Sequence, residues 1–172
     1  VTAVPLDRGN IIHVAQETYW GELAKGSDWP LAVEKALVSF RVAAAKCDLD
    51  VIDPMRSKNI TSTSDYIMEV LEQNFEFWRY EDITYDIASV EKPFTYVLFQ
   101  EYVEAFNDVV RILMMGKIDL VISSSRFSLS PMDHKSIDRD FGVKRFQNQF
   151  TNYAIATDSN LVLVNRIGLQ QS

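Results

Sequence analysis

The stretch from Thr95 to Ile122 constrains the fold of this chain more than any other. Its first part carries apolar residues at helical spacing, which are Leu98, Tyr102, Ala105, Phe106, Val109, Leu113 and Met114. Gly116 follows as a typical helix stop, and the apolar run 118–122 is typical of a buried strand. This succession of helix, glycine and strand predicts a helix over 95–115 that folds back against a sheet containing strand 118–122.

Two further helices are predicted upstream. Asp28 can accept the free backbone N–H groups of a helix start, and Pro30 suits an early helical position. Residues 38–45 fit a helix or a half-buried strand equally, because both spacings are present. A second helix is predicted from the hydroxyl-rich run 61–64 to about Trp78, with a buried stripe formed by Ile67, Val70, Leu71, Phe75 and Trp78.

Shorter elements complete the pattern. Residues 83–87 alternate apolar and polar side chains and predict a strand, and Pro93 is expected to end that region. A short helix is predicted at 130–133 from its cap and proline. Residues 153–156 and 161–164 predict two strands joined as a hairpin around the turn-forming residues 157–160.

Length and charge limit the class of protein. A chain of 172 residues fits one domain with a sizeable core. We predict an α/β fold: a single three-layer-like domain with a central mixed sheet and flanking helices, in which residues 1–28 are a candidate N-terminal extension. The net charge of −7 disfavours nucleic-acid binding. The sequence lacks an apolar run of about 18 residues, so we expect a soluble chain without direct membrane insertion.

We recognise no catalytic or metal-binding signature in the sequence. His13 and His134 lie far apart, and neither is seen to have a carboxylate at ligand spacing, so we expect no metal and no cofactor. Cys47 is the only cysteine and is expected to be inert. Asp119 lies between two apolar residues of the predicted strand, and it is therefore expected to be hydrogen-bonded. We name no catalytic residue; enzymatic activity stays open, with a non-enzymatic role favoured.

One polar segment is a candidate binding site. Ser124, Ser125 and Arg126 come directly after strand 118–122. Open α/β sheets place their ligand crevices at the carboxyl ends of such strands. Hydroxyl groups and a guanidinium there can hold a carboxylate, whereas an ordinary polar loop is the simpler alternative.

Residues 38–156 resemble the first lobe of the periplasmic-binding-like ligand domain of solute-binding proteins and ionotropic glutamate-type receptors. The similarity rests on residues 65–71, the strand near Ile83, and the runs 107–122, 127–131 and 136–138. It implies that Ser128 is a ligand-contacting hydroxyl. Asp133 stands where glutamate receptors have the arginine that binds the α-carboxylate, so amino-acid binding of that kind is not implied. The chain also ends about where a second lobe is expected to begin.

Two functions remain as hypotheses. The first is a non-enzymatic recognition domain that binds a small molecule or a protein partner at the loop 123–130 after the strand. The second is a structural or assembly subunit of a viral or other multi-protein particle, acting as a homo-oligomer or within a larger assembly. The aromatic content of 12%, which includes Trp20, Trp29 and Trp78, suits interface anchors as well as a core.

Overall fold

The computed structural model describes residues 4–46, 64–80, 85–137 and 147–169. These residues form three long helices, a sheet with an inserted fourth helix, and one single 3-10 turn. In chain order the elements are α1 (Val4–Ala24), α2 (Trp29–Lys46), α3 (Ser64–Tyr80), β1 (Tyr85–Val103), η2 (Glu104–Phe106), β2 (Asp108–Ser124), β3 (Phe127–Ile137), α4 (Gln147–Thr157) and β4 (Leu163–Gly168).

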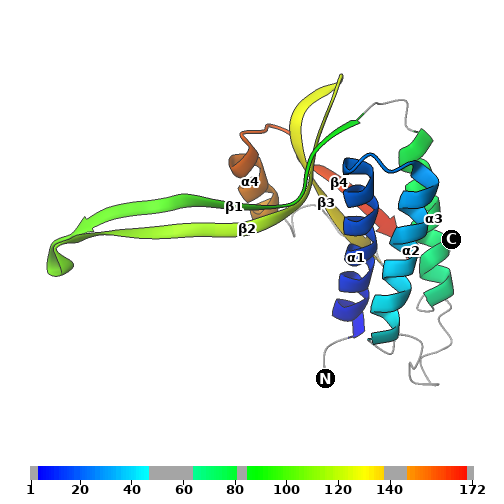
Figure 1. Cartoon of the computed structure of the whole chain (residues 1–172). Coiled ribbons are helices and arrows are strands. Elements are labelled where there is room, and N and C mark those ends of the chain that lie inside the picture. The colour runs from blue at the N-terminus through cyan, green and yellow to red at the C-terminus, as the bar shows by residue number, and fades with distance from the viewer. Residues whose placement is uncertain (1–3, 47–63, 81–84, 138–146, 170–172) are drawn as a thin grey trace.

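The four strands form one mixed sheet in the order β1-β2-β3-β4. Strands β1, β2 and β3 are antiparallel neighbours, and β4 runs parallel to β3. This confirms the predicted α/β class with a central mixed sheet and flanking helices. The β1–β2 pair extends far beyond the rest of the sheet as a narrow ribbon (Figure 1).

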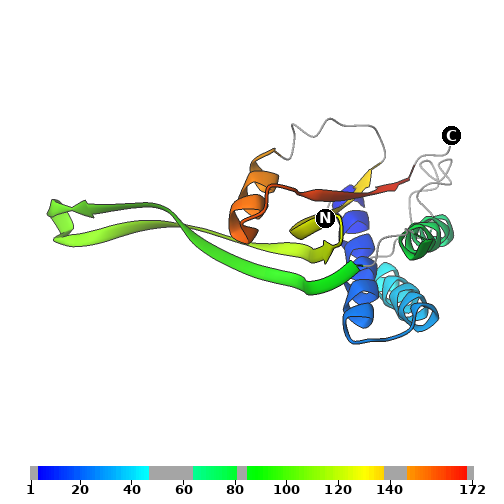
Figure 2. The ribbon, with the colours of Figure 1, turned by 90° about the horizontal axis from the view of Figure 1, so that it is seen from above.

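Helices cover the sheet in two groups. The larger core joins α1, α2 and α3 to Leu120 and Ile122 of β2 and Met132 of β3. A smaller cluster joins Ile118 and Val121 of β2 to Tyr153 of α4. Figure 2 shows α4 beside the sheet and apart from the other three helices. The arrangement places helices on both sides of the strands.

Helix α1 lies inside the segment considered as an N-terminal extension, and it supplies Ile11, Ile12, Ala15, Tyr19 and Trp20 to the core. The rings of Tyr19 and Phe75 stack with centroids 4.2 Å apart. The Trp20 ring meets that of Trp78 edge-on at 5.8 Å. Residues 4–24 are therefore part of the packed fold.

The predicted start of α2 and most of the predicted buried stripe of α3 are confirmed. The Asp28 carboxylate accepts the Leu31 N–H at 3.1 Å, which caps α2. Residues 38–45 are helical, since Phe40 and Ala44 are buried on one face. In α3, the predicted residues Ile67, Leu71 and Phe75 are fully buried.

The predicted helix 95–115 is wrong. Residues 85–103 and 108–124 form two strands instead, joined by the short turn η2. Strand 118–122 is confirmed as the part of β2 inside the sheet. The turn forms because Asn107 adopts a left-handed backbone with φ 47° and donates its N–H to the Glu104 carbonyl at 3.0 Å. Asn tolerates this conformation better than most residues.

Four smaller predictions also need correction. Pro93 does not end a region but lies within β1 opposite Lys117, where an edge strand tolerates the missing N–H. Residues 130–133 belong to β3, and 153–156 to α4. The predicted strand 161–164 is present as β4 from Leu163, but it pairs parallel with β3, so a hairpin around 157–160 does not form.

Some predictions fall outside the described residues, namely those on Cys47, on 61–63 and on the start of strand 83–87. Among the described helices, none is both long and apolar enough to cross a bilayer.

Candidate functional site

The most unusual feature of the molecule is the projecting ribbon, which we call the arm and define as residues 94–115. Its strands pair from Phe94 opposite Gly116 to Val103 opposite Asp108, with a β-bulge between Val97 and Phe99. Strand β3 pairs with β2 only over residues 120–124, so it does not reach the arm. In the described structure both long edges of the arm therefore lack a strand partner.

The arm exposes an exceptional amount of apolar surface. Phe106 at its end is 73% exposed and Met115 near its base is 67% exposed. Eight more of its large apolar side chains are exposed, namely Val97, Leu98, Phe99, Tyr102, Val109, Val110, Ile112 and Leu113. Exposed apolar patches of this extent are common at the binding surfaces of proteins.

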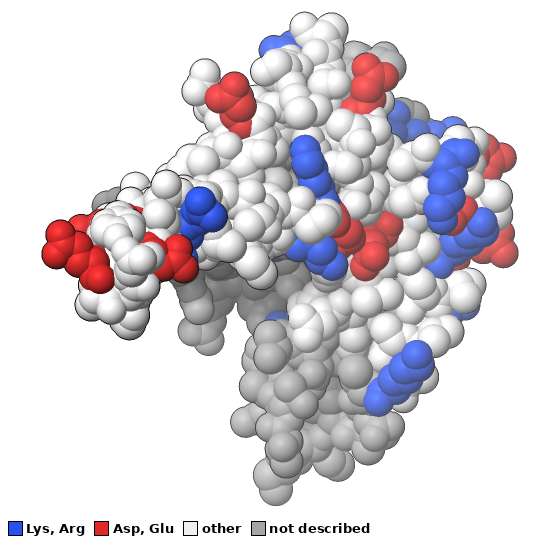
Figure 3. All heavy atoms as spheres, turned by 60° about the vertical axis from the view of Figure 1, so that its left-hand side comes forward, with Lys and Arg blue, Asp and Glu red and all other residues white. Residues whose placement is uncertain are grey.

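The end of the arm is acidic and carries two short side-chain hydrogen bonds. The Tyr102 hydroxyl donates to the Asn107 side-chain oxygen at 2.6 Å, and the Val109 N–H donates to the Asp108 carboxylate at 2.7 Å. Glu101 and Glu104 are exposed beside them. Figure 3 shows acidic groups at the end of the arm with a basic group close to them, and Arg111 is the one cation of residues 94–115.

Aromatic packing fixes the arm to the body. The ring of Phe94 lies over Gly116, where an added Cβ would come within 2.6 Å of it. Phe94 also meets the Tyr153 ring of α4 edge-on at 6.1 Å. The Tyr96 hydroxyl donates to Asn152 of α4 at 2.8 Å. Helix α4 therefore sets the direction in which the arm projects.

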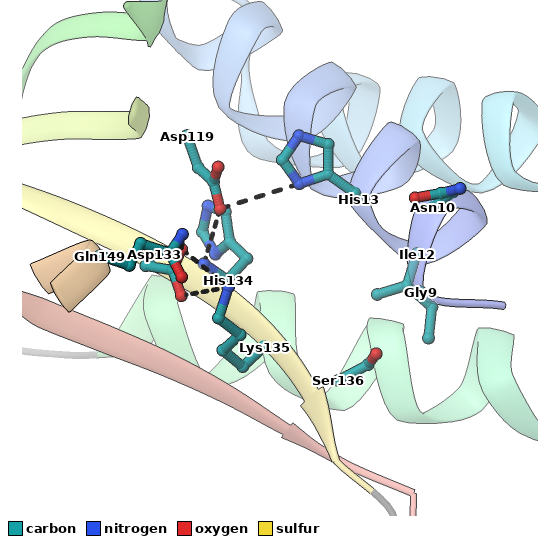
Figure 4. Close-up of a pocket in the computed structure, with 10 residues that line it drawn as sticks. All are labelled: Gly9, Asn10, Ile12, His13, Asp119, Asp133, His134, Lys135, Ser136 and Gln149. Carbon is teal, nitrogen blue, oxygen red and sulfur yellow. Dashed lines mark hydrogen bonds and ion pairs between the residues drawn. The ribbon is translucent and has the colours of Figure 1, made fainter. Parts of the chain in front are cut away.

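A polar pocket of about 340 Å³ lies between α1, β2, β3 and α4. Figure 4 shows His13, Asp119, His134, Asp133, Lys135 and Gln149 grouped on one side of it. The two aspartates stand one residue beyond the Leu120–Met132 pair of β2 and β3, so they are cross-strand neighbours. Like charges at such positions repel.

Each pocket aspartate has a fixed partner. The His134 N–H donates to the Asp119 carboxylate at 2.9 Å, which confirms that Asp119 is hydrogen-bonded. Lys135 forms an ion pair with Asp133 at 2.8 Å, and Gln149 donates to Asp133 at 2.9 Å. Burial raises the pKa of both carboxyl groups, and the His134 N–H and Lys135 respectively oppose that shift.

His134 is the end of a polar chain that crosses the core. Its Nδ1 accepts from Asn165 at 3.0 Å, and Asn165 bonds to Asn74, which in turn receives a bond from Gln16 at 3.0 Å. Burial lowers the pKa of His134 to about 3. The imidazole lies in β3 against the Trp20 ring, and its burial there keeps it neutral.

A second group of ionisable side chains adjoins the pocket. His13, Glu17 and Glu91 bring possible ligand atoms within 4.8 Å of one another. The expectation that His13 lacks a carboxylate at ligand spacing is wrong, because Glu17 follows it by one helical turn. His13 Nε2 contacts the Glu91 carboxylate at 2.7 Å, and Lys117 forms an ion pair with Glu91. These contacts link the helix to the base of the arm.

The predicted ligand residues lie elsewhere. Ser124 ends β2, Ser125 and Arg126 form a tight turn, and Ser128 is in β3. The Arg126 N–H donates to the Ser124 hydroxyl at 3.1 Å, as in an ordinary polar turn. Since β2 is antiparallel to both neighbours, the crevice expected for a parallel strand does not apply here. Ligand binding by these four residues stays a prediction.

No protein-family model and no curated protein matches the chain. The resemblance to the periplasmic-binding-like lobe also stays a prediction. The run 107–122, on which it rests, overlaps the predicted helix before Gly116, whereas Asp108–Ser124 form one strand.

Proposed function

We propose that this chain is a non-enzymatic recognition domain that binds a protein partner, and that the arm is its contact surface. The observation that carries the proposal is the apolar ribbon itself. Its large side chains expose on the order of 1,000 Å², against roughly 800 Å² per partner in a standard protein interface. That area is sufficient for specific binding.

The stability of the arm supports the same function. A two-stranded ribbon is only marginally stable in water when no further strand or helix covers it. Phe94 and Tyr96 are covered by α4, but from Val97 outward most apolar side chains face solvent. A partner that covers this part would stabilise its strands and remove its apolar surface from water. Binding and ordering of the arm are therefore coupled.

Photo-cross-linking tests this proposal. Phe106 is replaced by the photoreactive residue benzoylphenylalanine, and Phe77 of α3, which is 55% exposed on the body, receives the same replacement as a control. After irradiation in cells that make the natural chain, we expect protein adducts at position 106 and few at position 77. Equal yields at both positions, or none at 106, would refute the arm as the contact surface.

Binding of a small molecule at the turn 123–130 is a separate proposal, which the exposed Ser125 and Arg126 support only as available polar groups. Thermal-shift screening of organic acids checks it. Stabilisation that is lost in an Arg126→Ala variant is the expected result, and no stabilisation at high ligand excess would exclude it.

A further inference from the structure

The exposed face of α2 carries a second apolar stripe. Leu31, Val38 and Val42 are 39%, 51% and 51% exposed, and their spacing places them along one side of the helix. Their exposure contrasts with that of Phe40 and Ala44, which the core buries. This stripe therefore faces away from the sheet.

The unpaired charges around this stripe are mostly basic. Arg41 and Lys46 are exposed on α2, Lys35 forms an ion pair with Glu22 of α1 at 2.6 Å, and Glu34 is the one exposed carboxylate of that helix. The arm has the opposite pattern, because Glu101, Glu104 and Asp108 surround its apolar end and Arg111 is the cation among them. The two surfaces are complementary in charge, and both are apolar at their centres.

The dimensions also agree. Helix α2 has 18 residues, which corresponds to a length of about 27 Å. The arm strand from Phe94 to Val103 has a length of about 33 Å at the usual rise per residue. The arm projects away from the side of the molecule where α2 lies, so it does not reach α2 of its own chain (Figures 1 and 2).

We propose that the partner of the arm is a second copy of this chain, and that the arm of one copy docks along the exposed face of α2 of the next. The inference rests on the proposed function of the arm. Such a contact joins different surfaces of the two copies, so it propagates into a ring or an open chain rather than closing as a two-fold dimer. With one side of the arm covered, the joint buries on the order of 1,000 Å² in total, the lower limit for a specific interface.

Charge reversal in pairs tests the docking. The arm variant is E101K/E104K, and the α2 variant is R41E/K46E. Each variant places like charges at its own joint, so we expect sedimentation velocity to show each one alone associating at least tenfold more weakly than the natural chain. In a 1:1 mixture the two variants can alternate along the assembly, and every joint then brings opposite charges together. The association of the mixture should therefore return to the natural level.

A matched control separates docking from net charge. The variant E69K/E72K changes the net charge by the same amount as the arm variant, but on exposed residues of α3. It should associate like the natural chain. Unaltered association of the arm variant, or failure of the mixture to recover, would overturn the docking on α2.

A natural chain that stays monomeric at high micromolar concentration would overturn self-association itself. It would leave the proposed function standing if adducts with other proteins still form at position 106. The absence of any adduct at that position would refute both the proposed function of the arm and its docking on a second copy.

Discussion

Acidification should destabilise this protein through His134. In the folded chain the imidazole is buried, stacks against Trp20 with centroids 6.3 Å apart, and accepts a bond from Asn165. Burial, followed by the electrostatic effects of His13 and Lys135, lowers its pKa to about 3. In the unfolded chain the group has an ordinary pKa of about 6.5. The folded state therefore binds fewer protons between these two values.

The sign and size of the effect follow by linkage. The contribution of His134 to stability is complete above about pH 6.5 and is lost as the pH falls toward 3, because only the unfolded chain takes up the proton. Between pH 7.5 and pH 5 the loss is about 2 kcal/mol of unfolding free energy. The neighbouring carboxyl groups Asp119 and Asp133 have raised pKa values, so they change stability in the opposite direction on acidification.

Urea denaturation of the natural chain and of His134→Gln at pH 7.5 and pH 5 isolates this contribution. The other titrating groups are common to both proteins, so they largely cancel in the difference. We expect the natural chain to lose about 2 kcal/mol more than the variant over this interval. An equal loss in both proteins would show that the imidazole is protonated when folded, and the reasoning from burial would fail.

Three further substitutions have definite expected outcomes. Gly116→Ala places a Cβ against the Phe94 ring and should destabilise the chain by about 1–3 kcal/mol in urea denaturation, whereas Gly168→Ala, which meets no atom within 4 Å, should cost far less. Asp119→Ala leaves the His134 N–H without its acceptor and should cost about 1–3 kcal/mol, while Asp119→Asn keeps an acceptor and should cost less. Phe75→Ala removes a fully buried ring and should lower the unfolding free energy by about 3–5 kcal/mol; a loss below 1 kcal/mol would contradict the packing described for α3.

Helices α2 and α3 were predictable because each buries one face against a single core. Ile67, Leu71 and Phe75 recur at the helical period, and Asp28 supplies a recognisable cap. The mixed sheet was predictable only as a class, since strand order and the parallel pairing of β4 depend on contacts between distant residues. The strand at 118–122 was found from its apolar run, which the core requires on both sides of β2.

The arm was missed because its residues are apolar without a buried face. Strands are usually recognised by alternation, and alternation requires that one side face solvent and the other a core. Leu98, Phe99, Ile112 and Leu113 are all about half exposed, and a β-bulge lies between Val97 and Phe99, so the side chains here do not alternate between a buried and an exposed side. The β-branched and aromatic residues in this stretch, together with Asn107, were the signals that favoured a hairpin.

The polar pocket was missed for a different reason. Its residues come from α1, β2, β3 and α4, and sequence spacing does not show that they meet. The pair His13 and Glu17 at one helical turn was the one local signal available. Glu91 and Lys117 join it only because β1 and β2 are paired alongside α1.

The oxidation of Met115 tests the role of the arm most directly. This side chain is 67% exposed in the isolated chain, whereas Met132 is fully buried and serves as an internal control. Mild peroxide converts exposed methionine to its sulfoxide, and mass spectrometry measures the rate at each position. If the arm is a contact surface, Met115 is oxidised rapidly in the dilute purified chain and slowly when the natural chain is treated in its native extract. Equal rapid oxidation of Met115 in both samples would contradict the account.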